Sequence, residues 1–187
     1  MVLAYSLRIL KHICLGATST APHSAARQLR VTHRARLVDV DLFFHVNNAM
    51  YLRVAELSRW NNMASTGLLR TAFSNSWMFL VVKQNVQYHR PIAPFEKFDV
   101  VTSLAAADDK WIDFEHAFVR PGAAYPSETE KPMCVINART VVKRASGKTV
   151  RPSELAEANE WVRAHLDAAS GTPMPEERVS AAVNRRL

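Results

Sequence analysis

The chain has 187 residues, 48% of them hydrophobic, which is enough for one domain with its own core and extensions at the ends. Its formal charge is +7, but the first acidic residue is Asp39, and residues 1–38 hold six of the 24 Lys and Arg residues. Subtracting those six leaves 18 basic against 17 acidic residues, so the remainder carries only +1. A nucleic-acid-binding domain that is basic throughout is therefore not indicated.

The N-terminal segment, residues 1–27, has the composition of a targeting sequence. It contains Arg, Lys, Ser and Thr but no Asp or Glu, as mitochondrial presequences do. One helical face is apolar, with Leu3, Leu7, Leu10 and Cys14, and the basic side chains cluster away from it at Arg8, Lys11 and His12. We predict a protein of the mitochondrial matrix. A basic tail that binds a partner and an interfacial membrane anchor are the alternatives.

No transmembrane segment is expected, because no stretch reaches the roughly 18 uninterrupted apolar residues that a membrane-spanning helix needs. The two cysteines, Cys14 and Cys134, lie far apart and neither has a CxxC partner. We therefore expect neither a metal site nor a disulfide scaffold. Cys134 should be a small buried side chain within a strand.

The order of strand and helix patterns in residues 28–145 predicts one α+β domain. A strand over 28–38 is followed by a helix over 48–63 that is apolar on most faces, through Met50, Tyr51, Leu52, Val54, Ala55, Leu57, Trp60 and Met63. A helix that is apolar nearly all round is a buried one. Further strands are predicted over 77–89, 97–106, 110–119 and 132–144. This order places the helix on one side of an antiparallel sheet.

The run Trp77–Val82 is apolar without alternation, which predicts a strand buried on both faces. Residues 146–187 follow as a C-terminal extension. After a turn at Ser146-Gly147, a second helix should run from Pro152 to about Ala168 and lie on the surface. The tail beyond it should be flexible, or ordered only by a partner.

The densest group of reactive side chains lies between the first strand and the long helix: Asp39, Asp41, His45, Asn47 and Asn48. The two asparagines are good N-cap residues, so the helix should begin near Ala49. Asp41 and His45 then precede a helix N-terminus, whose amides and dipole can stabilise an oxyanion. A carboxylate there could attack a carbonyl group or activate water. A solvated Asp/Asn-rich turn is the alternative interpretation.

The run D-x-D-x-x-x-H-V-N-N-x-x-Y-x-x-x-x-E-x-x-R, from Asp39 to Arg59, resembles the active-site signature of the hotdog-fold thioesterases. It is similar to the 4-hydroxybenzoyl-CoA thioesterase group and to plant acyl-carrier-protein thioesterases. The segment 88–96 resembles the junction between two sheet strands in that family. The resemblance implies a hotdog fold, in which a curved antiparallel sheet wraps around the long central helix, here with an added C-terminal helix.

The resemblance also implies roles for individual residues. Asp41 matches the family's catalytic carboxylate, and His45 matches the histidine used with it in the acyl-carrier-protein branch. Phe44 stands where members commonly have a glycine, and Phe43 stands where that branch has an amide side chain. These two phenylalanines could line an acyl pocket or fill it.

The predicted substrate-binding residues are Phe43, Phe44, Asn47, Asn48, Tyr51, Glu56, Trp60 and Trp77. Glu56 and Arg59 are spaced i,i+3, so a structural ion pair or a dimer contact is the alternative for them. We expect a hydrolase of acyl-CoA or acyl-carrier-protein thioesters that needs no metal and no organic cofactor, since water is the second substrate. An open sheet needs its edges covered, so a homodimer is expected, as in family members.

The alternative function is a catalytically inactive hotdog protein that serves as an interaction or assembly module in a large mitochondrial complex such as the mitoribosome. Phe44 in place of glycine, the basic N-terminus and the charged tail suit that role. The N-terminal arginines could bind RNA phosphates. A fold does not fix a function, so the two functions must be separated by experiment. A hydrolase should cleave acyl-CoAs, whereas an assembly module should co-sediment with a large particle.

Overall fold

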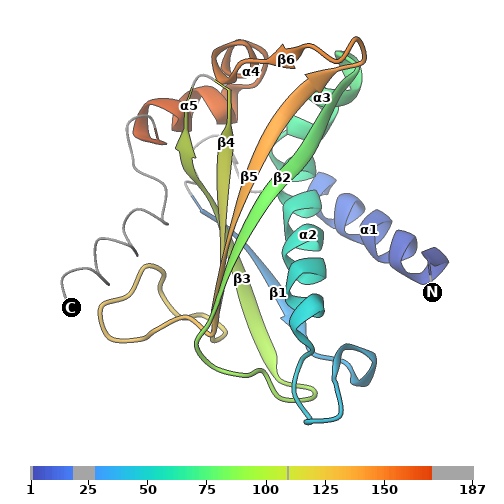
Figure 1. The fold of residues 1–187 in the computed structure, drawn as a ribbon, viewed down its shortest axis with the longest axis vertical. Coiled ribbons are helices and arrows are strands. Elements are labelled where there is room, and N and C mark those ends of the chain that lie inside the picture. The colour runs from blue at the N-terminus through green and yellow to red at the C-terminus, as the bar shows by residue number, and fades with distance from the viewer. Residues whose placement is uncertain (1, 19–27, 109, 170–187) are drawn as a thin grey trace.

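The computed structural model describes residues 2–18, 28–108 and 110–169, and Figure 1 shows their arrangement. The helices are α1 (Val2–Ala17), α2 (Asn48–Ser65), α3 (Leu68–Ser74), α4 (Pro152–Ala158) and α5 (Glu160–Ala169), with a 3-10 turn η1 (Leu37–Asp39). The strands are β1 (Gln28–Arg34), β2 (Trp77–Tyr88), β3 (Lys97–Ala107), β4 (Ile112–Val119), β5 (Cys134–Arg144) and β6 (Thr149–Val150). Every helix within the described ranges is too short or too polar to cross a membrane.

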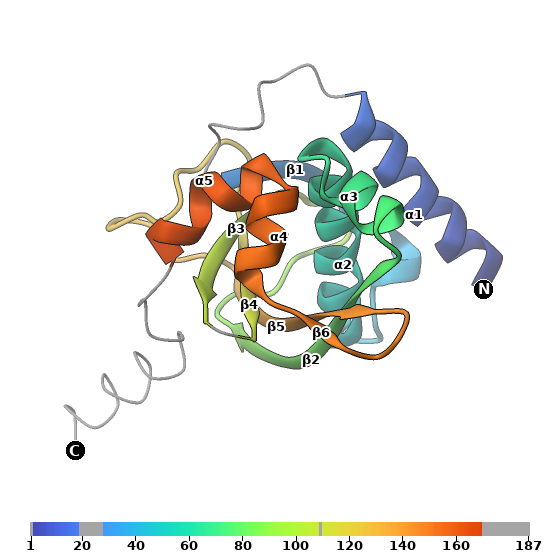
Figure 2. The same ribbon diagram turned by 90° about the horizontal axis from the view of Figure 1, so that it is seen from above.

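The strands form one antiparallel sheet in the order β1-β3-β4-β5-β2, with the short β6 paired to β5. The sheet curves around α2, as the two views in Figures 1 and 2 show. Helices α4 and α5 lie together at one end of the sheet. This arrangement confirms the predicted α+β hotdog fold, with a curved sheet around a long central helix and an added C-terminal helical part.

Helix α2 begins where the sequence predicts. Asn47 has an extended backbone, and its side chain accepts a hydrogen bond from the Ala49 amide at 2.9 Å, so it is the N-cap. Asn48 is the first helical residue. The helix ends before Gly67, whose φ of 71° is a left-handed conformation that glycine adopts without strain.

The buried face of α2 forms much of the core, through Tyr51, Val54, Ala55, Leu57, Ser58, Asn62 and Met63. Removing an apolar side chain of this size from water stabilises the fold by about 1.5–3 kcal/mol. The sheet supplies the other half of the contact, and its largest fully buried side chains include Phe98 and Phe118. Cys134 is also fully buried, as predicted, and burial raises the pKa of its thiol to about 12.

Helix α1 packs across α2 and reaches β1. Gly16 is buried at the crossing, where a Cβ atom would overlap the carbonyl oxygen of Asn61. The Asn61 side-chain amide donates to the carbonyl oxygen of His12 at 3.0 Å. The His12 ring stacks on the ring of His33 in β1, with 5.2 Å between centroids. Residues 2–17, predicted as a segment separate from the domain, are therefore packed onto it.

Two boundaries differ from the prediction. The first strand ends at Arg34, because Asp39 folds back and accepts a hydrogen bond from the Arg36 amide at 3.1 Å, which closes the η1 turn. The helix predicted from Pro152 to Ala168 is two helices. Asn159 between them has an extended backbone (φ −140°, ψ 117°), and its side-chain oxygen accepts from the Val162 amide at 3.0 Å.

These C-terminal helices lie on the surface as predicted, with Glu157, Glu160 and Arg163 exposed and their apolar face, Leu155, Trp161 and Val162, buried against the core. The turn at Ser146-Gly147 is confirmed, with Gly147 at a φ of 82°. Helix α3 and strand β6 were not predicted. The predicted tail lies outside the described residues.

The prediction that Trp77–Val82 is buried on both faces is wrong for the single chain. Strand β2 is an edge strand, paired only with β5 among the described strands. Met78, Leu80 and Val82 are exposed on it. An apolar run in the sequence cannot distinguish a strand buried within one chain from a strand that another surface covers.

The α1–α2 crossing yields a stability prediction. Gly16→Val should lower the free energy of unfolding by about 1–3 kcal/mol, because the new side chain overlaps Asn61 and forces the helices apart. Amide hydrogen exchange should rise in α1 at the same time. Ala17→Val, at the exposed neighbouring position, is the matched control. Equal thermal stability of the two variants would contradict close packing at Gly16.

Candidate active site

The turn between η1 and α2 holds the two aspartates of the motif in different environments. Asp39 is buried, and its carboxylate contacts the guanidinium groups of Arg8 and Arg36 at 3.4 and 3.3 Å. Asp41, two residues later, is partly exposed. Asp39 is therefore tied to the scaffold by two cations, and Asp41 is the carboxylate that a substrate can reach.

The turn itself is closed by short-range hydrogen bonds. The Phe44 amide donates to the carbonyl oxygen of Asp41 at 3.1 Å, and the Phe43 amide donates to Asp41 Oδ1 at 2.9 Å. His45 Nδ1 lies 3.7 Å from the same Oδ1 atom. The structure thus brings the two predicted catalytic residues together at near-contact distance, with the imidazole beside the carboxylate.

Phe44 has a φ of 59°, in the left-handed region that a phenylalanine rarely adopts. The glycine that the resemblance implies at this position would adopt this conformation without strain, because glycine has no Cβ to clash there. The Phe44 side chain is 78% exposed and that of Phe43 is 81% exposed. In the single chain, these two phenylalanines neither fill nor line the cavity described next.

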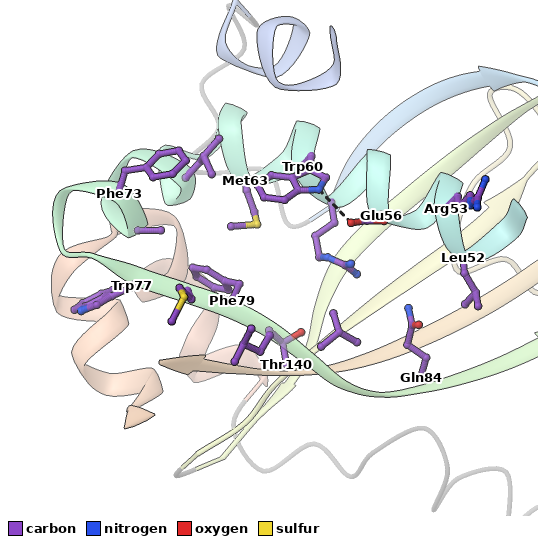
Figure 3. Close-up of a pocket in the computed structure, with 16 residues that line it drawn as sticks. Leu52, Arg53, Glu56, Trp60, Met63, Phe73, Trp77, Phe79, Gln84 and Thr140 are labelled. Atoms are coloured by element: carbon purple, nitrogen blue, oxygen red, sulfur yellow. Dashed lines mark hydrogen bonds between the residues drawn. The ribbon is translucent and has the colours of Figure 1, made fainter. Parts of the chain in front are cut away.

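A cavity of about 650 Å³ lies between α2, α3 and the edge strand β2 (Figure 3). Its volume is within the range of small-molecule sites, about 300–1,000 Å³. Apolar side chains dominate its walls, with Trp60 and Met63 from α2 facing Trp77 and Phe79 from β2. Such a cavity suits an acyl or aryl group.

Two charged residues of α2, Glu56 and Arg59, also line this cavity. Glu56 accepts hydrogen bonds from the Tyr5 hydroxyl of α1 and from the Trp60 indole, the latter at 3.5 Å. Burial, and then the hydrogen bond to Glu56, raise the pKa of Tyr5, so the phenol stays protonated as the donor. The acidic wall of the cavity is therefore fixed in place by the N-terminal helix.

Arg59 contacts a buried polar pair on the sheet. Its guanidinium lies 3.4 Å from His116 Nε2, and His116 Nδ1 lies 2.8 Å from the Thr102 hydroxyl. Burial, and then the charge of Arg59, hold the pKa of His116 well below its usual range. His116 is therefore neutral, with Nε2 accepting from Arg59 and Nδ1 donating to Thr102. Glu56 and Arg59, for which an ion pair was the alternative interpretation, contact separate partners, although the charge of Glu56 still favours the charged form of Arg59.

Two buried polar groups in the cavity wall have no hydrogen-bond partner among the described residues: the Thr140 hydroxyl and the Trp77 indole N–H. Buried polar groups are normally paired, so these two atoms are exceptions behind the cavity wall. Thr140 comes from β5, at the far wall from α2.

The structure divides the predicted site into two parts. Glu56, Trp60 and Trp77 line the cavity. Asp41, Phe43, Phe44, His45, Asn47 and Asn48 lie in the turn at the N-terminal end of α2. Tyr51 belongs to neither part, since it is buried against Tyr88 and Phe118 with ring centroids at 5.2 and 5.3 Å.

The prediction omitted Phe73, Phe79 and Thr140 from the cavity wall. Phe73 lies in helix α3, which was not predicted, so no feature of the sequence placed this side chain at the cavity. Thr140 had a signal, because it is one of the few polar residues in the apolar run 134–142 of β5. Among the described residues, no cluster of three or more His, Cys, Asp or Glu side chains could hold a metal ion.

Comparisons with known proteins agree with this geometry. The sequence profile of the thioesterase-like superfamily matches residues 35–177. The chain is 32% identical to Protein THEM6 of Xenopus laevis over 81 residues, which cover 43% of this chain and 39% of that protein. It is 28% identical to Protein THEM6 of Drosophila melanogaster over 130 residues, 67% of each chain. The chain spans less than half the length of the frog and zebrafish relatives.

The long-chain acyl-CoA thioesterase FadM of Escherichia coli is 27% identical over 77 residues, covering 41% of this chain and 58% of that protein. Among solved structures, the YbaW probable thioesterase from Escherichia coli superposes with a TM-score of 0.63 at 20% identity, covering 72% of this chain and 98% of that chain. A 4-hydroxybenzoyl CoA thioesterase bound to 4-hydroxybenzoyl CoA gives 0.60 at 16% identity, covering 71% and 99%. These two structures share the fold of this chain.

The backbone of the turn yields a prediction at Phe44. Phe44→Gly should raise the free energy of unfolding, because the left-handed conformation costs a phenylalanine about 1–3 kcal/mol. This gain exceeds the loss that comes from the larger conformational entropy of glycine in the unfolded chain. Thermal denaturation measures the change. Phe43→Gly, at an exposed position without a positive φ, is the control and should destabilise. If Phe44→Gly destabilises as much as the control, the turn is not strained as described.

Proposed function

The chain belongs to the thioesterase-like superfamily, and from that premise we propose that it hydrolyses acyl-CoA thioesters in the cavity between α2 and β2. The observation that carries the proposal is the position of that apolar cavity along the helix that directly follows the motif turn with Asp41. The acyl group would occupy the cavity, with the thioester carbonyl toward the motif turn. No organic cofactor or metal is needed for this reaction.

The relatives support coenzyme A as the carrier. FadM is named a long-chain acyl-CoA thioesterase, and a structural neighbour is a gentisyl-coenzyme A thioesterase. The apolar walls at Trp60, Met63 and Phe79 favour a hydrocarbon or aromatic acyl group over a polar one. An acyl-carrier-protein thioester, which presents the same reacting bond, is the second substrate class to assay.

In this proposal, Asp41 attacks the thioester carbonyl or removes a proton from the attacking water. Its carboxylate is held by the Phe43 amide at 2.9 Å. His45, at 3.7 Å, would orient Asp41 or return a proton to the thiolate that leaves. The positive end of the α2 dipole would stabilise the oxyanion. Asn47 acts indirectly, because its side chain already accepts the Ala49 amide and fixes the start of the helix.

We also propose that the protein is a homodimer. The edge strand β2 exposes Met78, Leu80 and Val82, and the motif turn exposes Leu42, Phe43 and Phe44. A second copy that covers both surfaces would remove these apolar groups from water and pair the open edge of the sheet. Sedimentation equilibrium that gives only the monomer mass at micromolar concentration would contradict the dimer.

Location in the mitochondrial matrix is a proposal that rests on the acid-free, basic composition of residues 1–38. Fusing residues 1–30 to a fluorescent reporter should direct the reporter to mitochondria. A diffuse signal would exclude targeting by this segment.

A catalytically inactive assembly module, as part of a large complex such as the mitoribosome, is the second candidate. The observation that favours it is the exposed apolar tip Leu42, Phe43 and Phe44, with Phe44 at the position where the resemblance to hotdog thioesterases implies a glycine. Phe44→Gly separates the candidates. A selective loss of turnover on long acyl chains supports a working hydrolase. A gain of turnover supports the inactive assembly module, because it shows that Phe44 blocks catalysis in the protein as it is.

The catalytic assignment yields a kinetic prediction. Asp41→Asn should lower kcat by about two orders of magnitude or more, the usual scale for losing a nucleophile or general base. The fold should survive, because an asparagine oxygen can still accept from the Phe43 amide. Hydrolysis of a panel of acyl-CoAs measures the effect.

Glu56→Gln is the matched comparison, since Glu56 is the carboxylate that lines the cavity and a glutamine can accept from the Trp60 indole through Oε1 and donate to the Tyr5 hydroxyl through Nε2. It should reduce turnover much less than Asp41→Asn. A large loss in Glu56→Gln together with normal turnover in Asp41→Asn would move the catalytic role from the turn to the cavity wall.

A further inference from the structure

The N-terminal helix packs onto the domain with its mixed polar face. The side chains that face the domain are Tyr5, Arg8, Ile9, His12 and Ile13, with Gly16 at the crossing. Tyr5 donates to Glu56, Arg8 contacts Asp39 at 3.4 Å, and His12 stacks on His33. An amphipathic helix on a soluble domain normally buries its apolar side. Helix α1 instead divides its apolar residues, with Ile9 and Ile13 toward the domain and Leu7, Leu10 and Leu15 exposed.

The leucines of α1 form a separate face that points outward, called here the leucine face. Leu7 is 58% exposed, Leu10 is 55% exposed and Leu15 is 51% exposed. Cys14 is exposed on the same side. Figure 2 shows α1 on the outside of the fold, with α2 between it and much of the sheet. Large apolar side chains gathered on one outward helix face indicate an interaction surface.

A basic groove borders this leucine face. It has a volume of about 440 Å³ and lies between α1 and β1, with Leu7 and Leu15 among its lining residues. Its charged lining residues are all cationic: Arg8, Lys11, Arg34 and Arg36. Asp39 contacts two of them, Arg8 and Arg36, and Asp99, which accepts from Thr32 of the groove, is paired with Arg30, so the cations of the groove outnumber the nearby acidic groups.

The cations of the groove are crowded. Burial lowers the pKa of Arg8, and the positive charge of Arg36 lowers it further. Burial also lowers the pKa of His12, followed by the charges of Arg8 and Lys11, so the imidazole stays neutral. An anion in the groove would relieve this repulsion between like charges. The groove therefore suits a phosphate group next to an apolar surface.

We propose that α1 and the groove beside it form a binding site for an anionic phospholipid membrane surface. The leucine face would enter the boundary between headgroups and acyl chains, and the groove cations would contact lipid phosphates. This is the arrangement of an interfacial amphipathic helix, whose affinity combines apolar burial with attraction to anionic lipids. The catalytic cavity on the opposite side of α2 would remain open to a substrate delivered from that surface.

A membrane accounts for both the leucine face and the basic groove, whereas each alternative partner accounts for only one of them. RNA would offer phosphates to the groove but no apolar partner for Leu7 and Leu10. A second protein molecule could cover the leucines, but it would need acidic side chains placed to meet the groove. The first 38 residues contain no acidic residue that would repel an anionic surface.

Flotation of the full chain with lipid vesicles tests the proposal. Binding should be strong to vesicles of phosphatidylcholine mixed with phosphatidylglycerol and weak to phosphatidylcholine alone, and it should fall as salt is raised. Equal binding to both compositions, or binding only to an RNA duplex in a parallel assay, would overturn it.

Variants separate the two halves of the surface. The double variant Leu7→Glu with Leu10→Glu should weaken binding by at least about tenfold, since both side chains point away from α2 and their loss leaves the packing intact. Ser146→Glu adds negative charge in the exposed turn between β5 and β6 and should bind normally. Lys11→Glu should weaken binding, whereas the charge-matched Lys148→Glu should not. Binding that survives both the leucine and the Lys11 variants would overturn the proposal.

Cys14 provides a readout that needs no substitution. It is exposed on the leucine face, and the other cysteine, Cys134, is buried. A membrane-impermeant maleimide should therefore label Cys14 in solution and should label it several times more slowly on anionic vesicles. Unchanged labelling of protein that has floated with vesicles would show that a different face binds the membrane.

Discussion

The fold depends on covering one long helix along its whole length. No residue of helix α2 from Met50 to Ser65 is exposed, so no single surface can bury it. The curved sheet covers one side and α1 crosses another. Asn47 fixes where this helix begins, and the motif turn must therefore lie at its N-terminal end. The cavity follows from the same constraint, because it lies where the edge strand β2 and α3 do not fully close over α2.

The site joins two elements that the chain positions independently. The turn places Asp41 and His45 beside each other through local hydrogen bonds, at the cost of a left-handed Phe44. The cavity depends instead on contacts between distant segments, with Glu56 fixed by Tyr5 and Arg59 by His116. A thioesterase needs both, since the carboxylate supplies the chemistry and the cavity supplies substrate binding.

Helix α1 connects the site to the outer surface. Its inward face supplies the donor that holds Glu56 at the cavity wall, and its outward face presents leucines beside a basic groove. The sequence signal that indicates a presequence, apolar residues on one face and no acids, is the same signal that an interfacial helix produces. The packing of Gly16 against Asn61 makes this segment part of the folded domain.

The sequence by itself determined the local features. The Asn47 cap, the extent of α2, most strand positions and the motif turn follow from propensities and periodicity that act over a few residues. Only the tertiary structure decided which surfaces meet. It made β2 an edge strand with Met78, Leu80 and Val82 exposed, broke the C-terminal helix at Asn159 and turned the leucines of α1 outward. An apolar pattern states that a face needs covering, but what covers it depends on contacts between residues far apart in the chain.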